Sequence, residues 1–417
     1  MVAQKIDLSK IVQQAKEKGY FDPADFSGQK LSWEQLKELS HFLEKEKIPV
    51  ETQNIRLDLS QMEALQVINS LRKGVPPQVN LTKFSVGRKK LIGRFKEDLE
   101  AAWHGSPQVR FLSADYGCGK THSLYLMRDH AFKEGFVVSI VTLSRNSCPI
   151  HDFMAVYYQI MWNLRTPQER MKPALENVLD MWFQKISEIG PSRARKIIEE
   201  FPDDLKNALT AYYQINNPLN NKKEEQKLLI FNYLSGKKVP LRDLREIGIR
   251  NRIDSSNALP MLGYMATLFR NLGYRGICIF FDEAESIHSF AKFEHQTRAY
   301  DNLLQIVKRS QSSSHCYFLY ATTPSFFDNY FFFWEDDPIR EDQIYELEKL
   351  DSEELKKLAS NLCQIYSLAV ESKFPPSIEQ TLKNLASYPS FSNNIGEFVR
   401  KCISYLDEKS DAKRRLD

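Results

Sequence analysis

The sequence has few features of a secreted, membrane-bound or metal-bound protein. Its six cysteines are scattered along 417 residues and form no C-x-x-C pair, a usage typical of a reducing cytoplasm that argues against disulfides and zinc. Its eight histidines show no H-E-x-x-H spacing. The longest apolar runs, such as Ile277–Phe281, are far too short to span a bilayer, and residues 1–10 lack the apolar core of a signal peptide. We therefore expect a cytoplasmic protein that does not contact membranes.

Strong charge of either sign is also missing. The formal net charge of +3 is small for this length, so the overall charge argues neither for nor against a nucleic-acid partner. The chain contains no internal repeat and no low-complexity tract. At 42% hydrophobic residues it can bury a substantial core, and 417 residues are too many for one ordinary domain.

A glycine-rich loop follows the apolar run 109–112 and predicts a nucleoside triphosphate site. Glycines let successive backbone N–H groups turn towards phosphate oxygens, and the next helix adds its positive end. In such loops the lysine neutralises the β- and γ-phosphates and the following hydroxyl binds Mg²⁺. The pattern G-x-x-x-x-G-K-[ST] is matched except at its first glycine. The loop reads Ala114-Asp115-Tyr116-Gly117-Cys118-Gly119-Lys120-Thr121.

The surroundings of the loop favour a strand–loop–helix–strand unit. Apolar residues after Thr121 recur with helical spacing up to Phe132, and residues 135–143 form a β-branched run typical of a strand. A phosphate loop needs this context, because its strand and helix fix the direction of the amides. The alternative is a glycine-rich turn that happens to contain a lysine.

A second buried strand is predicted over residues 276–281, ending in Asp282 and Glu283. Four or more apolar residues followed by two acids form the Walker B pattern, and such a run suits a parallel strand that is buried on both faces. We expect Asp282 to bind Mg²⁺, directly or through water, together with Thr121. Glu283 would orient and deprotonate the attacking water, whereas Glu285 is expected to support the site or to lie on the surface. The alternative is a strand that ends in solvated acids.

A further strand over residues 316–324 ends in Thr322 and Thr323. A polar residue at the end of the strand beside Walker B commonly contacts the γ-phosphate, so Thr322 and Thr323 are candidate sensors, and we assign the role to Thr322 in the working hypothesis. An ST-turn before proline is the alternative. No Asn-Lys-x-Asp guanine motif follows, which favours ATP as the nucleotide.

The predicted elements divide the chain into several regions. Residues 1–80 are expected to be helical, with capping boxes at Ser32-x-x-Gln35 and Ser60-x-x-Glu63. Residues 81–335 form the ATPase core, interrupted by a helical insertion at about 150–270. Residues 336–408 form a helical lid and 409–417 a charged tail. The predicted fold class is α/β, a P-loop NTPase with a parallel sheet that has helices on both faces.

Several segments together give the chain a resemblance to one family. Over roughly residues 60–405 it resembles the ATP-binding proteins of bacterial BREX (bacteriophage exclusion) systems, a branch of the AAA+/STAND P-loop ATPases. The resemblance implies antiphage defence and neighbours such as a DNA methyltransferase or a helicase. The segments that carry it are residues 68–77, Val86-Gly87-Arg88, Asp115–His122, Gly273–Gly276, Phe281–Glu285, Arg298–Leu303 and Ala321–Pro324.

The resemblance also implies roles for basic residues. Arg88 and His122 are candidate nucleotide contacts. For Arg88 the alternatives are a contact with a neighbouring subunit and an ordinary position on the surface. Arg309 and Arg340 fall where an arginine finger is expected, and such a finger contributes about 10³–10⁵ in kcat; surface or lid salt bridges are their alternative. Arg400 lies one turn later than the second basic sensor of AAA+ proteins.

The working hypothesis is an Mg²⁺-dependent ATPase switch that controls a protein–DNA assembly, as a homo-oligomer or with other defence proteins. One alternative is a scaffold that binds ATP with negligible hydrolysis. Another is a DNA-binding motor subunit that uses basic residues at 83–96 and 193–196 to contact phosphates.

Overall fold

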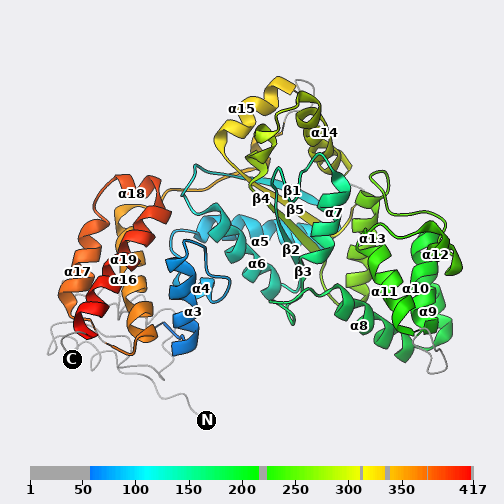
Figure 1. Cartoon of the computed structure of the whole chain (residues 1–417), viewed down its shortest axis with the longest axis horizontal. Helices are drawn as coiled ribbons and strands as arrows, with labels where there is room; N and C mark the ends of the chain where they lie inside the picture. The colour runs from blue at the N-terminus through cyan, green and yellow to red at the C-terminus, as the bar shows by residue number, and fades with distance from the viewer. Residues whose placement is uncertain (1–56, 216–222, 310–312, 334–338, 373, 415–417) are drawn as a thin grey trace, which may run out of the picture.

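A computed structural model describes residues 57–215, 223–309, 313–333, 339–372 and 374–414. Its centre is a sheet that separates a helical insertion from a second group of helices near the C-terminus (Figure 1). Ser32-x-x-Gln35 and the tail after Arg414 lie outside the described residues. Among the described helices, none is long and apolar enough to cross a membrane.

The sheet has six strands in the order β3-β2-β4-β5-β1-β6. All neighbouring strands run parallel except β3, which pairs antiparallel with β2. The order places the strand of the phosphate loop, β1, two positions from the Walker B strand, β4, with β5 between them. The strands are β1 Gln108–Ser113, β2 Val137–Thr142, β3 Leu164–Arg165, β4 Ile277–Asp282, β5 Cys316–Thr322 and β6 Ile344–Glu346.

The alternation of side chains along the strands gives the sheet two apolar faces, as expected for a buried parallel sheet. On one face, Leu112 and Phe280 pack with helices α5 (Lys89–Trp103) and α6 (Lys120–Lys133). On the other face, Phe111 and Phe281 join a larger cluster. That cluster includes α7 (Phe153–Trp162), α13 (Ala258–Asn271), α14 (Phe293–Arg309) and α15 (Pro324–Phe333). Both the predicted α/β class and the strand–loop–helix–strand unit are confirmed.

The segment between α7 and α13 is helical, as the sequence predicted. Its helices share the hydrophobic cluster of α7 and α13, with the fully buried Trp182 among their side chains. The helices are α8 Leu175–Glu188, α9 Pro191–Glu199, α10 Asp203–Ile215, α11 Lys223–Leu234 and α12 Leu241–Glu246.

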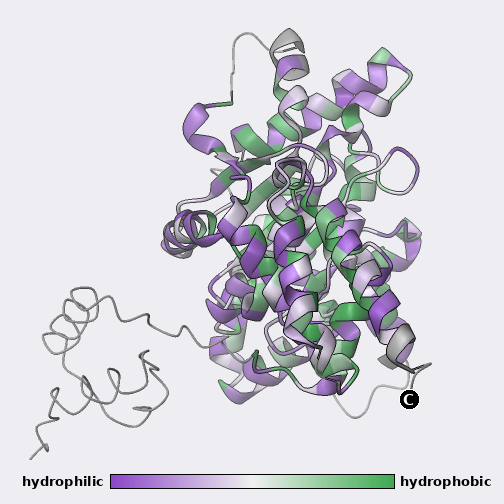
Figure 2. Ribbon diagram, turned by 90° about the vertical axis from the view of Figure 1, so that its left-hand side faces the viewer, coloured by the Kyte–Doolittle hydropathy of each residue, from purple (hydrophilic) through white to green (hydrophobic). Residues whose placement is uncertain are grey.

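The C-terminal helices form a separate hydrophobic cluster with α3 (Gln61–Arg72) and α4 (Leu81–Phe84). The Ser60–Glu63 capping box begins α3 and the Asp351–Glu354 capping box begins α16. Side by side, α3 and α16 join parts of the chain about 290 residues apart (Figure 1). Figure 2, which has the C-terminal helices at the front, shows hydrophobic and hydrophilic residues alternating along those helices, as expected where one face of each is buried. The C-terminal helices are α16 Ser352–Ala369, α17 Pro376–Leu385, α18 Ser390–Asn393 and α19 Ile395–Arg414.

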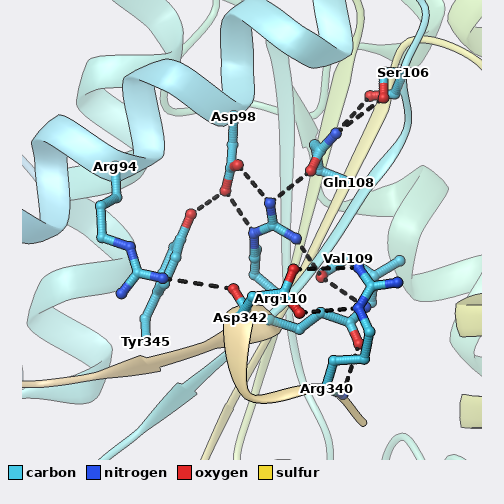
Figure 3. A network of polar contacts seen from close by, with 10 residues as sticks. Arg94, Asp98, Ser106, Gln108, Val109, Arg110, Arg340, Asp342 and Tyr345 are labelled. Carbon is cyan, nitrogen blue, oxygen red and sulfur yellow. Dashed lines mark hydrogen bonds and ion pairs between the residues drawn. The ribbon is translucent and has the colours of Figure 1, made fainter.

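A buried ionic network ties α5 to the strands β1 and β6. The Arg110 guanidinium donates to both Asp98 carboxylate oxygens, at 2.8 and 2.7 Å, and the Tyr345 hydroxyl donates to the same carboxylate (Figure 3). Burial and the nearby carboxylate raise the pKa of Tyr345 above its usual range. The network lies towards the amino end of β1 and holds α5 against the strand that carries the phosphate loop.

Candidate functional site

The phosphate loop connects the carboxyl end of β1 to the first residue of α6. Gly117 and Gly119 have φ values of +83° and +91°, a backbone region that favours glycine. Ala114, which replaces the first glycine of the pattern, does not have positive φ. Its methyl group is therefore tolerated, and the departure from the pattern leaves the loop able to turn its amides inward.

Lys120 begins α6, and its ammonium group is turned back towards the loop. Its Nζ donates to the carbonyl oxygens of Ala114 at 2.8 Å and Asp115 at 3.4 Å. The Glu285 carboxylate lies 3.8 Å away, and the Tyr116 ring lies beneath the ammonium at 4.9 Å. The cation thus has partners that a bound triphosphate would have to replace.

Thr121 and Asp282 meet where the Walker A and Walker B segments come together. The Thr121 hydroxyl donates to Asp282 Oδ2 at 2.7 Å, and the backbone N–H of Glu283 donates to Oδ1 at 3.1 Å. Burial raises the pKa of Asp282, while its hydrogen bond from Thr121 opposes that effect. A hydroxyl and a carboxylate are the oxygen ligands that Mg²⁺ prefers, so this pair fits the ion. The described residues contain no group of three or more His, Cys, Asp or Glu placed to hold a metal unaided.

The two glutamates after Asp282 have different surroundings. Glu283 is exposed and adopts a left-handed conformation, with φ +59° and ψ +40°, which costs about 1–3 kcal/mol for a residue with a side chain. Burial and the neighbouring Asp282 raise the pKa of its carboxyl. Glu285 is buried, and its Oε2 has no hydrogen-bond partner among the described residues. Sequence reasoning gave Glu285 only a supporting or surface position, whereas the structure places it beside Lys120.

Thr322 ends β5 directly beside the last residue of β1. It pairs with Ser113, and its carbonyl oxygen accepts a hydrogen bond from Ala114 N at 3.1 Å. The side chain is fully buried, and its hydroxyl has no partner among the described residues. The strand therefore brings Thr322 to the start of the phosphate loop, and the sensor role remains a prediction.

Arg88 and His122 support the loop from the side of α4 and α5. The buried Arg88 donates to the carbonyl oxygens of Cys118 at 3.0 Å and Glu348 at 2.9 Å, and its pKa is lowered by burial. His122 Nε2 lies 2.8 Å from Ser85 Oγ. Desolvation, with the nearby Arg88 charge, lowers the pKa of His122 to about 4, so the ring is neutral at pH 7. Both residues line the cavity described next.

A cavity of about 570 Å³ opens above the phosphate loop, between the sheet and the C-terminal helices. Its polar lining includes the loop, Asp282, Glu283 and Glu285. Much of the remaining lining is apolar, so the cavity offers polar contacts for phosphates and apolar contacts for a base. The apolar lining residues are Leu71, Val75, Pro76, Phe84, Val86, Leu350, Leu358, Leu362, Ile395 and Val399.

The start of α19 touches the phosphate loop directly. The Gly396 N–H donates to the carbonyl oxygen of Gly117 at 3.0 Å, and the Cys118 thiol donates to the Asn393 carbonyl at 3.4 Å. A Cβ on Gly117 would lie 2.4 Å from Oδ1 of Asn394, so the loop and the lid are closely fitted here. Arg400, one turn further along α19, lines the cavity although its position in the sequence departs from the AAA+ pattern.

Of the two arginine-finger candidates, Arg340 lies outside the cavity. Arg340 precedes β6, which runs parallel to β1, so it lies at the end of the sheet opposite the phosphate loop. There it pairs with Asp342 at 2.9 Å and is largely exposed (Figure 3). Arg309 is the last residue of α14, and its side chain lies outside the described residues. Arg340 does not contribute to the site within one copy of the chain, and an arginine-finger role for either residue remains a prediction.

The basic residues at 83–96 are mostly occupied within the chain. Lys90 pairs with Glu348 at 2.9 Å, and Arg94 stacks on the Tyr345 ring at 4.4 Å. Arg88 is buried. The segment is therefore not a free row of cations for a nucleic-acid backbone, which weakens the DNA-motor alternative.

Sequence reasoning missed the apolar lining of the cavity. Residues 71–76 were assigned to an N-terminal region without a site, and Val399 was assigned only to a lid helix. The Leu71–Pro77 segment did contain a signal, because Gly74 and two prolines end a helix there. Its partner surface on α16 and α19 comes from the far end of the chain and leaves no local pattern.

Comparison with known families agrees with these features. A family model described as BREX system ATP-binding protein BrxC/D matches residues 59–331, from the start of α3 into α15. The match contains the phosphate loop, the Walker B strand and β5. No curated protein matches the chain.

Proposed function

Because the chain belongs to the family of BREX system ATP-binding proteins BrxC/D, we propose that it is an ATPase switch in antiphage defence. ATP binds with its phosphates at the loop and its base against the apolar lining of the cavity. Hydrolysis is slow in the isolated chain and changes the position of the helical lid. The output is control of an assembly of defence proteins on DNA, as a homo-oligomer or with partners such as a methyltransferase or helicase.

The observation that carries this proposal is the meeting of four groups in one cavity. Lys120 and Thr121 come from the loop, and Asp282 and Glu283 come from the strand two positions away. The Thr121–Asp282 contact at 2.7 Å fixes the two segments relative to each other. A phosphate loop alone could bind an anion, but a loop opposed by two acids is suited to phosphoryl transfer.

Each residue then has a definite task. The loop amides and Lys120 hold the β- and γ-phosphates, which requires the ammonium to leave the Ala114 and Asp115 carbonyls. Thr121 and Asp282 would hold Mg²⁺. When bound, the ion neutralises charge that develops on the phosphates. Glu283, with a pKa raised by burial and by Asp282, accepts the proton of the attacking water and orients it.

The lid is coupled to the nucleotide through the loop itself. Gly396 N–H binds the Gly117 carbonyl, so a change in the loop moves the start of α19. Arg400 on the same helix lines the cavity and is placed to respond to a phosphate. This coupling favours a switch over a passive ATP-binding scaffold.

The test is Glu283→Gln, measured with radiolabelled ATP. Binding should persist while turnover falls about 10²–10⁴-fold, the usual contribution of a general base. Lys120→Ala is the companion variant and should lose binding itself. Equal turnover in the parent and in Glu283→Gln would remove Glu283 from its role, and negligible turnover in both would favour the scaffold.

A further inference from the structure

A second cavity, of about 390 Å³, lies at the edge of the sheet beyond β2. It shares no lining residue with the nucleotide cavity. The two cavities follow each other along α6, since Thr121 lines the first and Tyr125, one turn later on the same face of the helix, lines the second. The phosphate-loop function does not use this second cavity.

Three arginines and no acidic residue line the second cavity. Arg128 comes from α6, Arg165 from β3, and Arg170 from the loop after β3. Around them stand neutral hydrogen-bonding groups, which are the side chains of Gln78, Tyr125, Thr142, Ser147, Gln159 and Asn163. A cavity with this lining offers positive charge and neutral polar contacts at once.

Arg128 forms the buried part of the site, with only 6% of its surface exposed. Its guanidinium pairs with Asp129 at 3.1 Å and donates to the carbonyl oxygen of Gln78. It also stacks on the rings of Tyr125 and Phe132, at 4.9 and 5.8 Å. These contacts fix the orientation of the group before any ligand arrives, so little entropy is lost on binding.

Among the described residues, the hydrogen bonds of Arg165 and Arg170 go to main-chain oxygens. Arg165 Nη1 donates to the carbonyls of Leu164 at 2.9 Å and Trp162 at 3.3 Å, and Arg170 Nε donates to that of Pro167 at 3.0 Å. Among the described residues neither has a carboxylate within ion-pair distance. Each therefore keeps guanidinium N–H groups for a ligand.

The three cations repel one another. Arg170 lies over the same Phe132 ring as Arg128, at 5.4 Å, on the cavity wall. The pKa of Arg165 is lowered, first by burial and then by the charge of Arg128. Three guanidiniums with one carboxylate partner leave uncompensated positive charge, and a bound anion would relieve this repulsion.

We propose that this cavity binds a phosphate monoester of a small polar molecule. Arginine N–H groups match the geometry of phosphate oxygens in pairs, and the amides of Gln159 and Asn163 can bind the polar remainder. A volume of about 390 Å³ lies within the roughly 300–1,000 Å³ range of small-molecule sites, which favours a small ligand over a nucleic-acid strand.

The experiment is calorimetric titration of the full chain with inorganic phosphate and with ribose 5-phosphate. The double variant Arg165→Gln/Arg170→Gln should weaken binding at this site at least about tenfold, because charge-assisted hydrogen bonds are lost. Lys120→Ala removes phosphate binding at the loop and should leave this site intact. The matched control Arg193→Gln/Arg250→Gln changes two exposed arginines elsewhere and should not alter binding.

The outcomes separate this proposal from the ATPase proposal. If both proposals hold, the parent binds phosphate at two sites. Lys120→Ala then keeps only the arginine-lined site, and the double variant keeps only the phosphate-loop site. If the ATPase proposal alone fails, the parent has one site, which the double variant loses. Phosphate binding that the double variant leaves unchanged overturns the second site, as does tighter binding of a 5′-phosphorylated oligonucleotide than of ribose 5-phosphate. Should the double variant not fold, Arg170→Gln alone provides the same test, because Arg170 is exposed.

Discussion

Replacing Glu285 with glutamine should tighten ATP binding. In the structure the Glu285 carboxylate lies 3.8 Å from the Lys120 ammonium, which donates to the carbonyls of Ala114 and Asp115. Lys120 must leave these partners to reach the β- and γ-phosphates. The carboxylate also repels the incoming triphosphate, so both effects of Glu285→Gln act in the same direction.

The size of the effect follows from the distance. Two unit charges at about 4 Å attract by about 4 kcal/mol at an effective dielectric constant of 20, which is an upper bound for the Glu285–Lys120 pair. The desolvation cost of a buried pair cancels much of this attraction. The two carbonyl hydrogen bonds of Lys120 also remain in the variant. We therefore expect a gain of about 1–2 kcal/mol, or a roughly five- to thirtyfold lower Kd.

The assay is equilibrium binding of a non-hydrolysable ATP analogue to the parent and to Glu285→Gln. AMP provides a ligand control, since it lacks the phosphates that Lys120 would contact, and its Kd should change little. Weaker binding of the ATP analogue in the variant would refute the reasoning and would show that Glu285 helps to hold the nucleotide. Equal tightening for AMP would point to a general change in the cavity.

Two other predictions concern stability. Asp98→Asn leaves the partly buried Arg110 guanidinium without its carboxylate partner and should lower the free energy of unfolding by about 2–3 kcal/mol. Urea unfolding measures this loss, and Asp342→Asn, in the exposed pair with Arg340, should cost less than about 1 kcal/mol. Equal losses would contradict the role of the buried network. The pKa of His122 is lowered from 6.5 to about 4, so the unfolded chain binds the proton more readily and the free energy of unfolding decreases as pH is lowered from about 6.5 to about 4. The fall amounts to up to about 3 kcal/mol, and His122→Gln should remove that part of the slope; an unchanged slope would refute it.

The sequence predicted the central unit well because its signals are local. A strand that is buried on both faces is an uninterrupted apolar run, and a phosphate loop needs glycine where φ is positive, as at Gly117 and Gly119. In contrast, β3 is only two residues long and exists because it pairs with the edge of β2. The helices α10 and α12 were not predicted, since the surrounding pattern of charged and aromatic residues gave them no distinct boundaries.

The site was predictable only where its residues are close to the loop or to the end of a strand. Arg340 was chosen by its place in the chain, but the parallel pairing of β6 with β1 puts it at the far end of the sheet. Glu285 was undervalued because a residue three positions past the end of a strand would ordinarily be exposed. The turn at Glu283, with its left-handed φ, brings Glu285 back into the cavity.

The position of α3 bears on how the switch could work. Helices α3 and α16 share one hydrophobic cluster, and residues 71–76 line the cavity together with α19. The lid therefore combines chain that comes before the sheet in the sequence with chain that comes after it. Arg72 joins these parts through its contact with Asp407 at 2.5 Å. A change at the loop that moves Gly396 would therefore also move α3, because α3 and α19 are packed together.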